Sequence, residues 1–155
     1  MSAIDDSADA GFEFPDPAPY PVPVMGLFDR PFWRSVLAQR TSLQKCDDCG
    51  AFRYPPGPCC PECLSPQATW TQLLGGGTIL SWVVFHRQYL PAYPAPHAVV
   101  AVRLDEGPVM MSNLEGEWPK NSWIGRRVRL VHHEIPGGFV LPRFQLVDDE
   151  RSAEI

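Results

Sequence analysis

The stretch "CDDCGAFRYPPGPCCPEC", residues 46–63, holds all five cysteines of the chain and decides the fold around it. Cys46-x2-Cys49 and Cys60-x2-Cys63 are two C-x-x-C pairs separated by ten residues. Each pair can aim two thiolates at one point, and two such pairs complete a tetrahedral shell of four sulfurs around a metal ion. The spacing therefore predicts a metal-binding ribbon with these four cysteines as its ligands.

Cys59 is the odd cysteine, and we expect it to stay free. Pairing Cys59 with Cys63 would give the spacing C-x3-C, whereas Cys60 and Cys63 repeat the spacing of the first pair. An odd number of cysteines without an export signal argues against disulfides. Zinc is favoured, with iron in a rubredoxin-like site as the alternative. Four thiolates leave no coordination position for water or substrate, so the predicted metal is structural.

Composition and charge restrict the class of protein. The 155 residues include 18 prolines and 12 glycines, which favours short strands and many turns. A net charge of −5 argues against binding to nucleic acid or to an anionic membrane. The first ten residues, "MSAIDDSADA", are acidic and lack the apolar run of a signal peptide. We therefore predict a cytoplasmic protein of mainly β structure, without a membrane span.

Changes in composition divide the chain into five segments. They are an extended proline-rich tail at 1–24, a helix with a lead-in strand at 25–44, the zinc ribbon at 45–68, a β domain at 69–148 and a tail at 149–155. The alternating prolines of the first segment exclude a helix there. That segment is either a disordered tail or a strap laid across a partner.

A short helix is predicted just before the ribbon. Asp29 suits the cap and Pro31 suits the first turn, where its missing N–H costs nothing. One apolar stripe follows, formed by Phe32, Trp33, Val36 and Leu37. Such a stripe packs either on the chain's own core or on another chain.

Residues 69–147 have the pattern of short strands. Six segments are rich in β-branched and aromatic residues: 69–74, 78–89, 97–104, 107–114, 126–135 and 139–147. Turn signals separate them, among them "GGG" at 75–77. Five or six antiparallel strands in about 80 residues fit a small barrel such as the OB-fold, with a meander or a small sandwich as the alternative.

The sequence offers no convincing catalytic set. The four histidines, His86, His97, His132 and His133, show no spacing that couples one of them to a nucleophile, and no P-loop or nucleophile-elbow motif is found. Basic residues form a cluster at Arg126, Arg127 and Arg129 and a smaller one at His86 and Arg87. They are either solvated strand ends or a set of cations that holds the phosphates of an anionic ligand such as coenzyme A.

The order of these parts resembles a known family. An "FW" helix (Phe32, Trp33) leads through "LQKCDDCG" to "YPPGPCCPEC", and "GGGTILSWVVFHR" and "HAVVAVRLDEGPVMMSNL" follow. This order is similar to the acyl-CoA-associated zinc-ribbon/OB-fold family, catalogued as domain of unknown function 35, from about Asp29 to Val147. The resemblance implies an N-terminal helix, a rubredoxin-like zinc ribbon and a five- or six-stranded OB-fold barrel.

The resemblance also implies a role. Members of that family bind thiolase-fold proteins and help to enclose acyl-CoA while the partner supplies the catalytic groups. We therefore expect a non-catalytic subunit in a heterotetramer around the partner's dimer. The expected reaction is retro-aldol carbon–carbon cleavage, as in steroid side-chain breakdown. The alternatives are an accessory subunit of a thiolase- or HMG-CoA-synthase-type acyltransferase complex and, from another class, an OB-fold nucleic-acid-binding module.

Six residues are the expected contacts to coenzyme A or to the partner: Phe32, Trp33, His86, Arg87, Arg126 and Arg127. No catalytic residue is expected on this chain.

Overall fold

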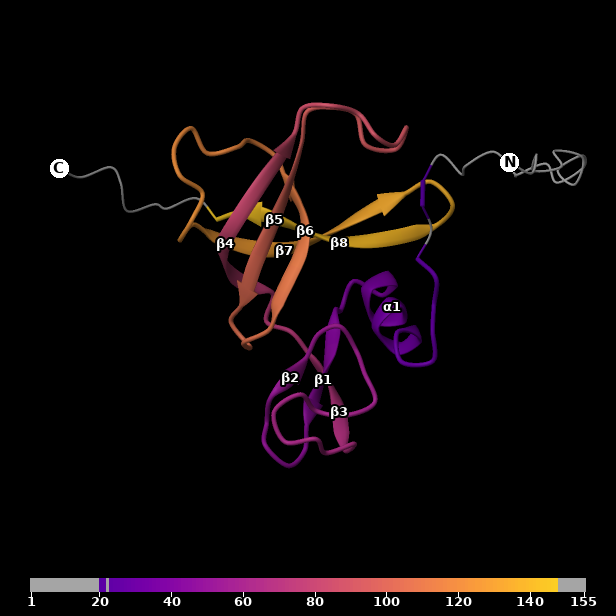
Figure 1. The fold of residues 1–155 in the computed structure, drawn as a ribbon. Coiled ribbons are helices and arrows are strands. Elements are labelled where there is room, and N and C mark those ends of the chain that lie inside the picture. Colours follow the sequence, from indigo (N-terminus) through magenta and orange to yellow (C-terminus); the bar gives the residue numbers. More distant parts are fainter. Residues whose placement is uncertain (1–19, 22, 148–155) are drawn as a thin grey trace, which may run out of the picture.

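A computed structural model of the chain describes residues 20–21 and 23–147 (Figure 1). The proline-rich tail expected at 1–24 lies almost wholly outside the described residues, as does the tail expected at 149–155. The elements in chain order are α1 (Arg30–Leu37), β1 (Ser42–Cys46), β2 (Phe52–Arg53), β3 (Ala68–Gln72), β4 (Gly76–Phe85), β5 (His97–Leu104), β6 (Val109–Glu115), β7 (Arg127–Ile135) and β8 (Phe139–Leu146). The described residues thus form the predicted mainly-β fold with one short helix.

The helix α1 begins where the sequence predicts, but only part of its apolar stripe is buried. Pro31 lies in the first turn, and Asp29 occupies the cap position without a capping hydrogen bond from its side chain. Phe32 and Val36 are buried in the chain's own core, whereas Leu37 is 57% exposed. In the described part of the chain, no helix has the length and apolar character needed to cross a membrane.

The first sheet is the ribbon, with strand order β2-β1-β3. β3 pairs with β1 along its whole length, from Ser42 opposite Gln72 to Cys46 opposite Ala68. The strand predicted at 69–74 was counted with the β domain, and in the structure it pairs with β1 in the ribbon sheet. Its partner is β1, because the second C-x-x-C turn must return the chain beside the first to bring the two cysteine pairs together.

The second sheet closes into a barrel with the order β4-β5-β6-β8-β7. Its strands are antiparallel except for β6 and β8, which pair in parallel through Leu114 and Phe144. The prediction that all barrel strands are antiparallel was therefore wrong for one pair, β6 and β8. Figure 1 shows the barrel above the ribbon and α1, with the loop between β4 and β5 at the end away from the ribbon.

The "GGG" segment is only partly the predicted turn. Gly75 has a positive φ of +85°, but Gly76 and Gly77 already belong to β4. A Cβ atom on Gly77 would lie 2.5 Å from Cγ1 of Val102 and 2.9 Å from the carbonyl oxygen of Arg103. The glycine is needed because β5 passes too close for any side chain.

One continuous core joins the helix, the ribbon and the barrel. Its members include Phe32 of α1, Leu43 of β1 and, inside the barrel, Val100 and Phe144. The junction also contains a hydrogen bond of 2.9 Å between Thr41 Oγ1 and Nε2 of His132 in β7. The barrel and the ribbon are therefore packed against each other.

Candidate functional site

The structure brings the four predicted ligands together. The Sγ atoms of Cys46, Cys49, Cys60 and Cys63 all lie within 4.8 Å of one another. The Cys46–Cys63 sulfur distance is 3.6 Å, and the Cys49–Cys60 distance is 3.5 Å. Zn–S bonds of about 2.3 Å in a tetrahedron put the sulfurs roughly 3.8 Å apart. The donor set and its spacing thus fit a structural zinc ion.

Two similar turns position these thiols. Gly50 N–H donates to the carbonyl oxygen of Cys46 at 2.9 Å, and Leu64 N–H donates to that of Cys60 at 2.9 Å. Both turns need a positive φ, which is +78° at Gly50 and +63° at Leu64. Glycine supplies this conformation at little cost, whereas Leu64 adopts it with a side chain. Each turn leaves both sulfurs of its pair facing the other pair.

The pKa shifts of the four thiols favour binding of a cation. The backbone N–H of Cys49 lowers the pKa of the Cys46 thiol to about 6, and that of Cys63 lowers the pKa of Cys60. The backbone N–H of Ala51 acts to lower the pKa of Cys49, but the neighbouring thiols of Cys63 and Cys60 outweigh it and raise this pKa to about 12. Four thiols so close together cannot all ionise alone, and a bound divalent cation removes that conflict.

Cys59 lies outside the cluster. Its neighbour Cys60 is buried, whereas Cys59 is exposed. The group of four sulfurs does not include it.

Arg53 is a structural residue of the ribbon that the sequence did not reveal. Its side chain is buried. Its guanidinium donates to the carbonyl oxygens of Ser65 at 2.8 Å, Gln67 at 2.9 Å and Gly57 at 3.4 Å. These bonds tie the segments on either side of the second cysteine pair to β2. A surface arginine and a buried one look the same in sequence, because burial depends on how the loops wrap.

The two expected contacts on the helix behave differently. Phe32 is 3% exposed, with its ring 5.1 Å from that of Trp33 and 5.9 Å from that of Tyr54. The prediction that Phe32 contacts coenzyme A or a partner does not fit the structure, because this side chain lies inside the chain's own core. Trp33 is half-buried and lines an apolar cavity with Leu37 and Phe139.

The expected basic contacts do not form one site. Arg127 pairs in the sheet with Thr78 near the start of β4, whereas His86 and Arg87 follow the last residue of that strand. A strand rise of about 3.3 Å per residue separates these places by roughly 25 Å. Arg126 is exposed and lines a cavity of about 470 Å³ near Arg129.

Arg127 is already engaged. Its guanidinium donates to both carboxylate oxygens of Asp105 at 2.7 Å and to Thr78 Oγ1 at 3.0 Å. These bonds with Arg127 lower the pKa of Asp105. The bidentate pair links β7 to the end of β5, which is a structural use of this arginine.

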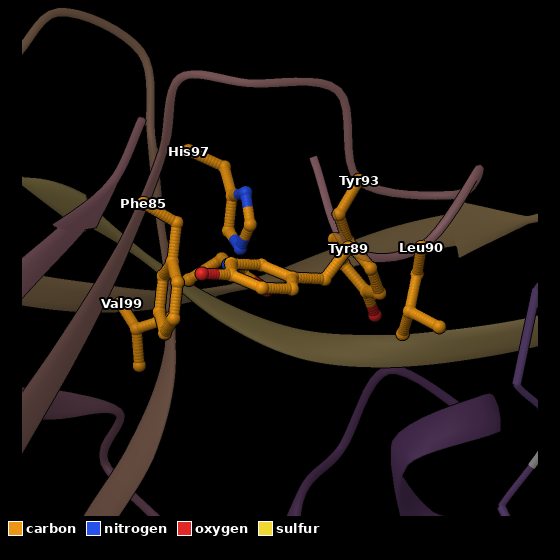
Figure 2. A pocket seen from close by; sticks show the side chains of 7 residues that line it. Phe85, Tyr89, Leu90, Tyr93, His97 and Val99 are labelled. Carbon is orange, nitrogen blue, oxygen red and sulfur yellow. The ribbon is translucent and has the colours of Figure 1, made fainter. Parts of the chain in front are cut away.

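The structure also contains a cavity that sequence reasoning missed. It has a volume of about 330 Å³ and lies between the loop that joins β4 to β5 and the outer face of the barrel. Figure 2 shows its lining, which consists of Phe85, Tyr89, Leu90, Tyr93, His97, Val99 and Asn113. The aromatic residues of "FHRQYLPAYPAPH" were the available signal, but they belong to a segment whose path only the fold defines.

Comparison with known proteins agrees with this architecture. Residues 33–68 match the family model described as "ChsH2, rubredoxin-like zinc ribbon domain". Residues 70–133 match the one described as "ChsH2, C-terminal OB-fold domain". A "DUF35 domain-containing scaffold protein" of Pyrococcus furiosus is 30% identical over 108 residues, which cover 67% of this chain and 77% of that protein. The chain belongs to the DUF35 family. The resemblance seen in the sequence is thereby confirmed.

Two further relatives are longer than this chain. The chain is 36% identical over 118 residues to a "Probable enoyl-CoA hydratase alpha subunit" of Thermomonospora curvata and covers 37% of it. It is 32% identical over 105 residues to the "3-oxo-4,17-pregnadiene-20-carboxyl-CoA hydratase alpha subunit" of Mycobacterium tuberculosis and covers 33% of it. These matches take up 76% and 68% of the chain. The chain thus spans about a third of the length of both hydratase subunits.

One solved structure is similar to this chain over most of its length. The structure named "Ltp2-ChsH2(DUF35) aldolase" superposes with a TM-score of 0.74 at 32% sequence identity. The match covers 81% of this chain and 98% of that one. It shows the same ribbon-and-barrel fold.

Proposed function

We propose that this chain is a non-catalytic accessory subunit of an acyl-CoA lyase. It binds a thiolase-fold partner, assembles around the partner's dimer as a heterotetramer and helps to enclose an acyl-CoA thioester. The partner cleaves a carbon–carbon bond of the acyl group by a retro-aldol reaction. The substrate class is a CoA thioester with a steroid-like acyl group.

The observation that carries this proposal is the match to the DUF35 component of an aldolase. The match spans 98% of that chain. The name of the Pyrococcus furiosus relative, a scaffold protein, points in the same direction. The Mycobacterium tuberculosis relative is named for a steroid CoA thioester, which supports the substrate class.

The surface of the barrel supports the presence of a partner. On the outer face of β4, β5 and β6, Val83 pairs with Val99 and Ala101 pairs with Met111. Met111 is 68% exposed and Val83 is 47% exposed. The water-facing side of an antiparallel sheet is ordinarily polar, so an apolar face of this kind favours a protein that covers it. We therefore place the partner on this face and not on the buried side of α1.

The metal has a structural part in this proposal. Cys46, Cys49, Cys60 and Cys63 would hold a zinc ion, which supplies the folding free energy that so small a ribbon cannot obtain from its own core. The ribbon in turn packs on one end of the barrel core and supports it. His86, Arg87 and Arg126 stay expected contacts to coenzyme A or to the partner, because all three are exposed. Since Arg126 lies at the opposite end of β4 from His86 and Arg87, the two groups would meet different parts of the complex.

The partner is tested by affinity purification of the tagged chain from its native host, followed by mass spectrometry. We expect a thiolase-fold protein, with a complex mass that fits two copies of each chain. Met111→Glu puts a charge on the apolar face and should abolish co-purification. Leu74→Glu, at a side chain 90% exposed elsewhere on the molecule, is the matched control and should leave it intact.

The activity is tested on the reconstituted complex with a steroid CoA thioester bearing a hydroxyl β to the thioester carbonyl. We expect cleavage to a ketone and a shorter CoA thioester, and loss of turnover when the chain is omitted. Condensation or acyl transfer without cleavage would support the acyltransferase alternative. Unchanged turnover by the partner alone would refute the accessory role.

A further inference from the structure

The cavity under the β4–β5 loop has the character of a site for a flat apolar group. None of its seven lining residues is Lys, Arg, Asp or Glu, and most are aromatic or aliphatic. Its volume of about 330 Å³ is within the range of small-molecule sites, roughly 300–1,000 Å³. Tyr89 and Leu90, on the loop, are 68% and 45% exposed, so the cavity is open to ligands on that side.

Aromatic rings define the shape of this cavity. The imidazole of His97 stacks on the ring of Phe85, with centroids 4.8 Å apart and planes within 9°. Tyr89 meets Phe85 edge-on at 6.2 Å, and Tyr93 is tilted against His97 at 5.5 Å. Figure 2 shows the Tyr89 side chain reaching across from the loop toward the ring of Phe85. Walls built from ring faces and edges suit a rigid, flat ring system better than a flexible chain.

One polar atom of the lining residues has no hydrogen-bond partner among residues 20–21 and 23–147. Nδ1 of His97 is buried and has no hydrogen-bond partner within the described residues. Buried polar atoms of this kind are uncommon, and an ordered water or ion is one usual explanation. A second cavity of about 260 Å³ adjoins the first, because Tyr93, His97 and Asn113 line both. The apolar space therefore continues into a more polar one.

The polar space is held by an ion-pair cluster. Glu115 Oε1 lies 2.5 Å from Nη1 of Arg143 and 3.2 Å from Nδ1 of His133. Nε of Arg143 is buried and has no hydrogen-bond partner within the described part of the chain. A ring system lying in the first cavity would thus have this polar cluster beyond one edge and apolar walls elsewhere.

The position of the cavity on the barrel agrees with ligand binding. β5 and β6 are the second and third strands of the barrel, and the loop at 86–96 joins its first two strands. OB-folds bind their ligands on this face and with this loop. The cavity also adjoins the apolar face proposed for the partner, since Val99 belongs to both.

We propose that this cavity binds the fused-ring part of the acyl group, a flat alicyclic ring system with an oxygen substituent directed at His97 and the Arg143 side. The inference rests on the proposed function and names the part of the substrate that this chain itself recognises. The adenine ring of coenzyme A is the competing flat group. The ribose attached to this ring carries a phosphate and the pyrophosphate arm, and no Lys or Arg is among the seven lining residues to pair with them. Arg87, whose guanidinium lies 5.8 Å from the Tyr89 ring, is outside that lining.

The test is equilibrium dialysis of the full, metal-loaded chain without any partner. Its probes are progesterone as a fused-ring ketone, free coenzyme A as the nucleotide without an acyl group, and octanoate as a linear acyl chain. We expect saturable binding of progesterone and weaker binding of the other two. Tyr89→Ala and Leu90→Arg, both on the exposed loop, should weaken progesterone binding by about tenfold or more. Leu74→Ala should leave it unchanged.

Three results would overturn the inference: no saturable progesterone binding, tighter binding of coenzyme A or octanoate, or unchanged binding in both loop variants. Because the dialysis contains no partner, its outcome is independent of the accessory role. Progesterone binding without co-purification of a thiolase-fold protein would sink the proposed function alone. Co-purification and cleavage without progesterone binding would sink only this inference.

Discussion

The Cys46 and Cys60 thiols occupy equivalent positions in two similar turns. Each accepts a backbone N–H from the second cysteine of its own pair, and this bond is the largest cause of its lowered pKa. Backbone donors thus prepare thiolates before a metal arrives. The cation then lets the remaining two thiols ionise, so metal binding and folding of the ribbon are one process.

Replacing one cysteine at a time should therefore distinguish the four metal ligands from Cys59. We expect Cys49→Ala to lose the bound metal and to lower the free energy of unfolding by on the order of 3 kcal/mol or more. Cys59→Ala is the matched control, because its exposed side chain lies outside the sulfur cluster. Metal content by mass spectrometry and thermal unfolding measure both effects. Equal metal loss in the two variants would contradict the assignment of ligands.

His132 links the barrel to the chain before the ribbon, and its protonation should affect stability. Burial lowers its pKa below the ordinary value of 6.5. The unfolded chain then binds more protons in acid, so this contribution to stability is fully present above about pH 6.5 and is lost as the pH falls through the folded pKa.

We expect His132→Gln to flatten the acid side of the stability profile. The variant should be less stable than the parent by about 1 kcal/mol at neutral pH, since its bond to Thr41 is perturbed. This difference should shrink as the pH drops toward about 5. Urea unfolding of both proteins across this range measures it, and the shared titration of the cysteines cancels in the comparison. Parallel profiles would show that His132 does not contribute.

The strand β4 illustrates how one element depends on its neighbours. It pairs with β5 over most of its length and with β7 only near its start. Its register with β5 shifts between Ile79 and Ser81, where a bulge bends the strand. The close approach at Gly77 lies on the same strand, in the short segment that pairs with both neighbours. Closure of the barrel thus depends on a residue without a side chain.

A single methyl group at that position should be costly. We expect Gly77→Ala to lower the free energy of unfolding by about 1–3 kcal/mol, because the new Cβ would collide with Val102 and with the backbone of Arg103. Gly57→Ala is the matched control, since a Cβ there meets nothing within 4 Å. Chemical denaturation compares the two. If Gly77→Ala left the free energy of unfolding unchanged, β5 would be able to shift away from the new methyl group at little cost.

The ribbon and the barrel share a core but differ in what holds them. Within the barrel, side chains such as Val100, Val102, Met110 and Phe144 are fully buried. The ribbon has few buried apolar residues and depends on the metal cluster and on Arg53. The molecule should therefore come apart at the ribbon first when the metal is removed.

We expect a chelator to unfold the ribbon while the barrel persists. Hydrogen exchange should become fast in β1 and β3, whereas amides of β5 and β7 stay protected. Loss of protection throughout would mean that the shared core makes the two parts one cooperative unit. Adding zinc back should restore the ribbon and serves as the control for irreversible damage.

Much of the fold was predictable from local pattern. The two C-x-x-C pairs define the metal cluster by spacing alone, because a turn of this kind positions both sulfurs without help from the rest of the chain. The runs of β-branched and aromatic residues located β5, β7 and β8 to within a few residues, since such residues fit a pleated, half-buried surface. The fold class and the metal ligands could therefore be predicted without the tertiary structure.

Other features depended on contacts between distant segments. Whether β3 joins the ribbon or the barrel, whether Phe32 faces outward, and whether Arg53 is buried are all decided by which surfaces meet. The aromatic cavity is the clearest case, because its lining comes from three strands and a loop. Phe85 lies in β4, Tyr93 in the loop, His97 in β5 and Asn113 in β6. Sequence determined the ribbon and the strand-rich barrel, where the physical requirement lies within one turn or one strand. Only the tertiary structure decided the cavity and the apolar face, because each exists through the packing of segments that no local rule brings together.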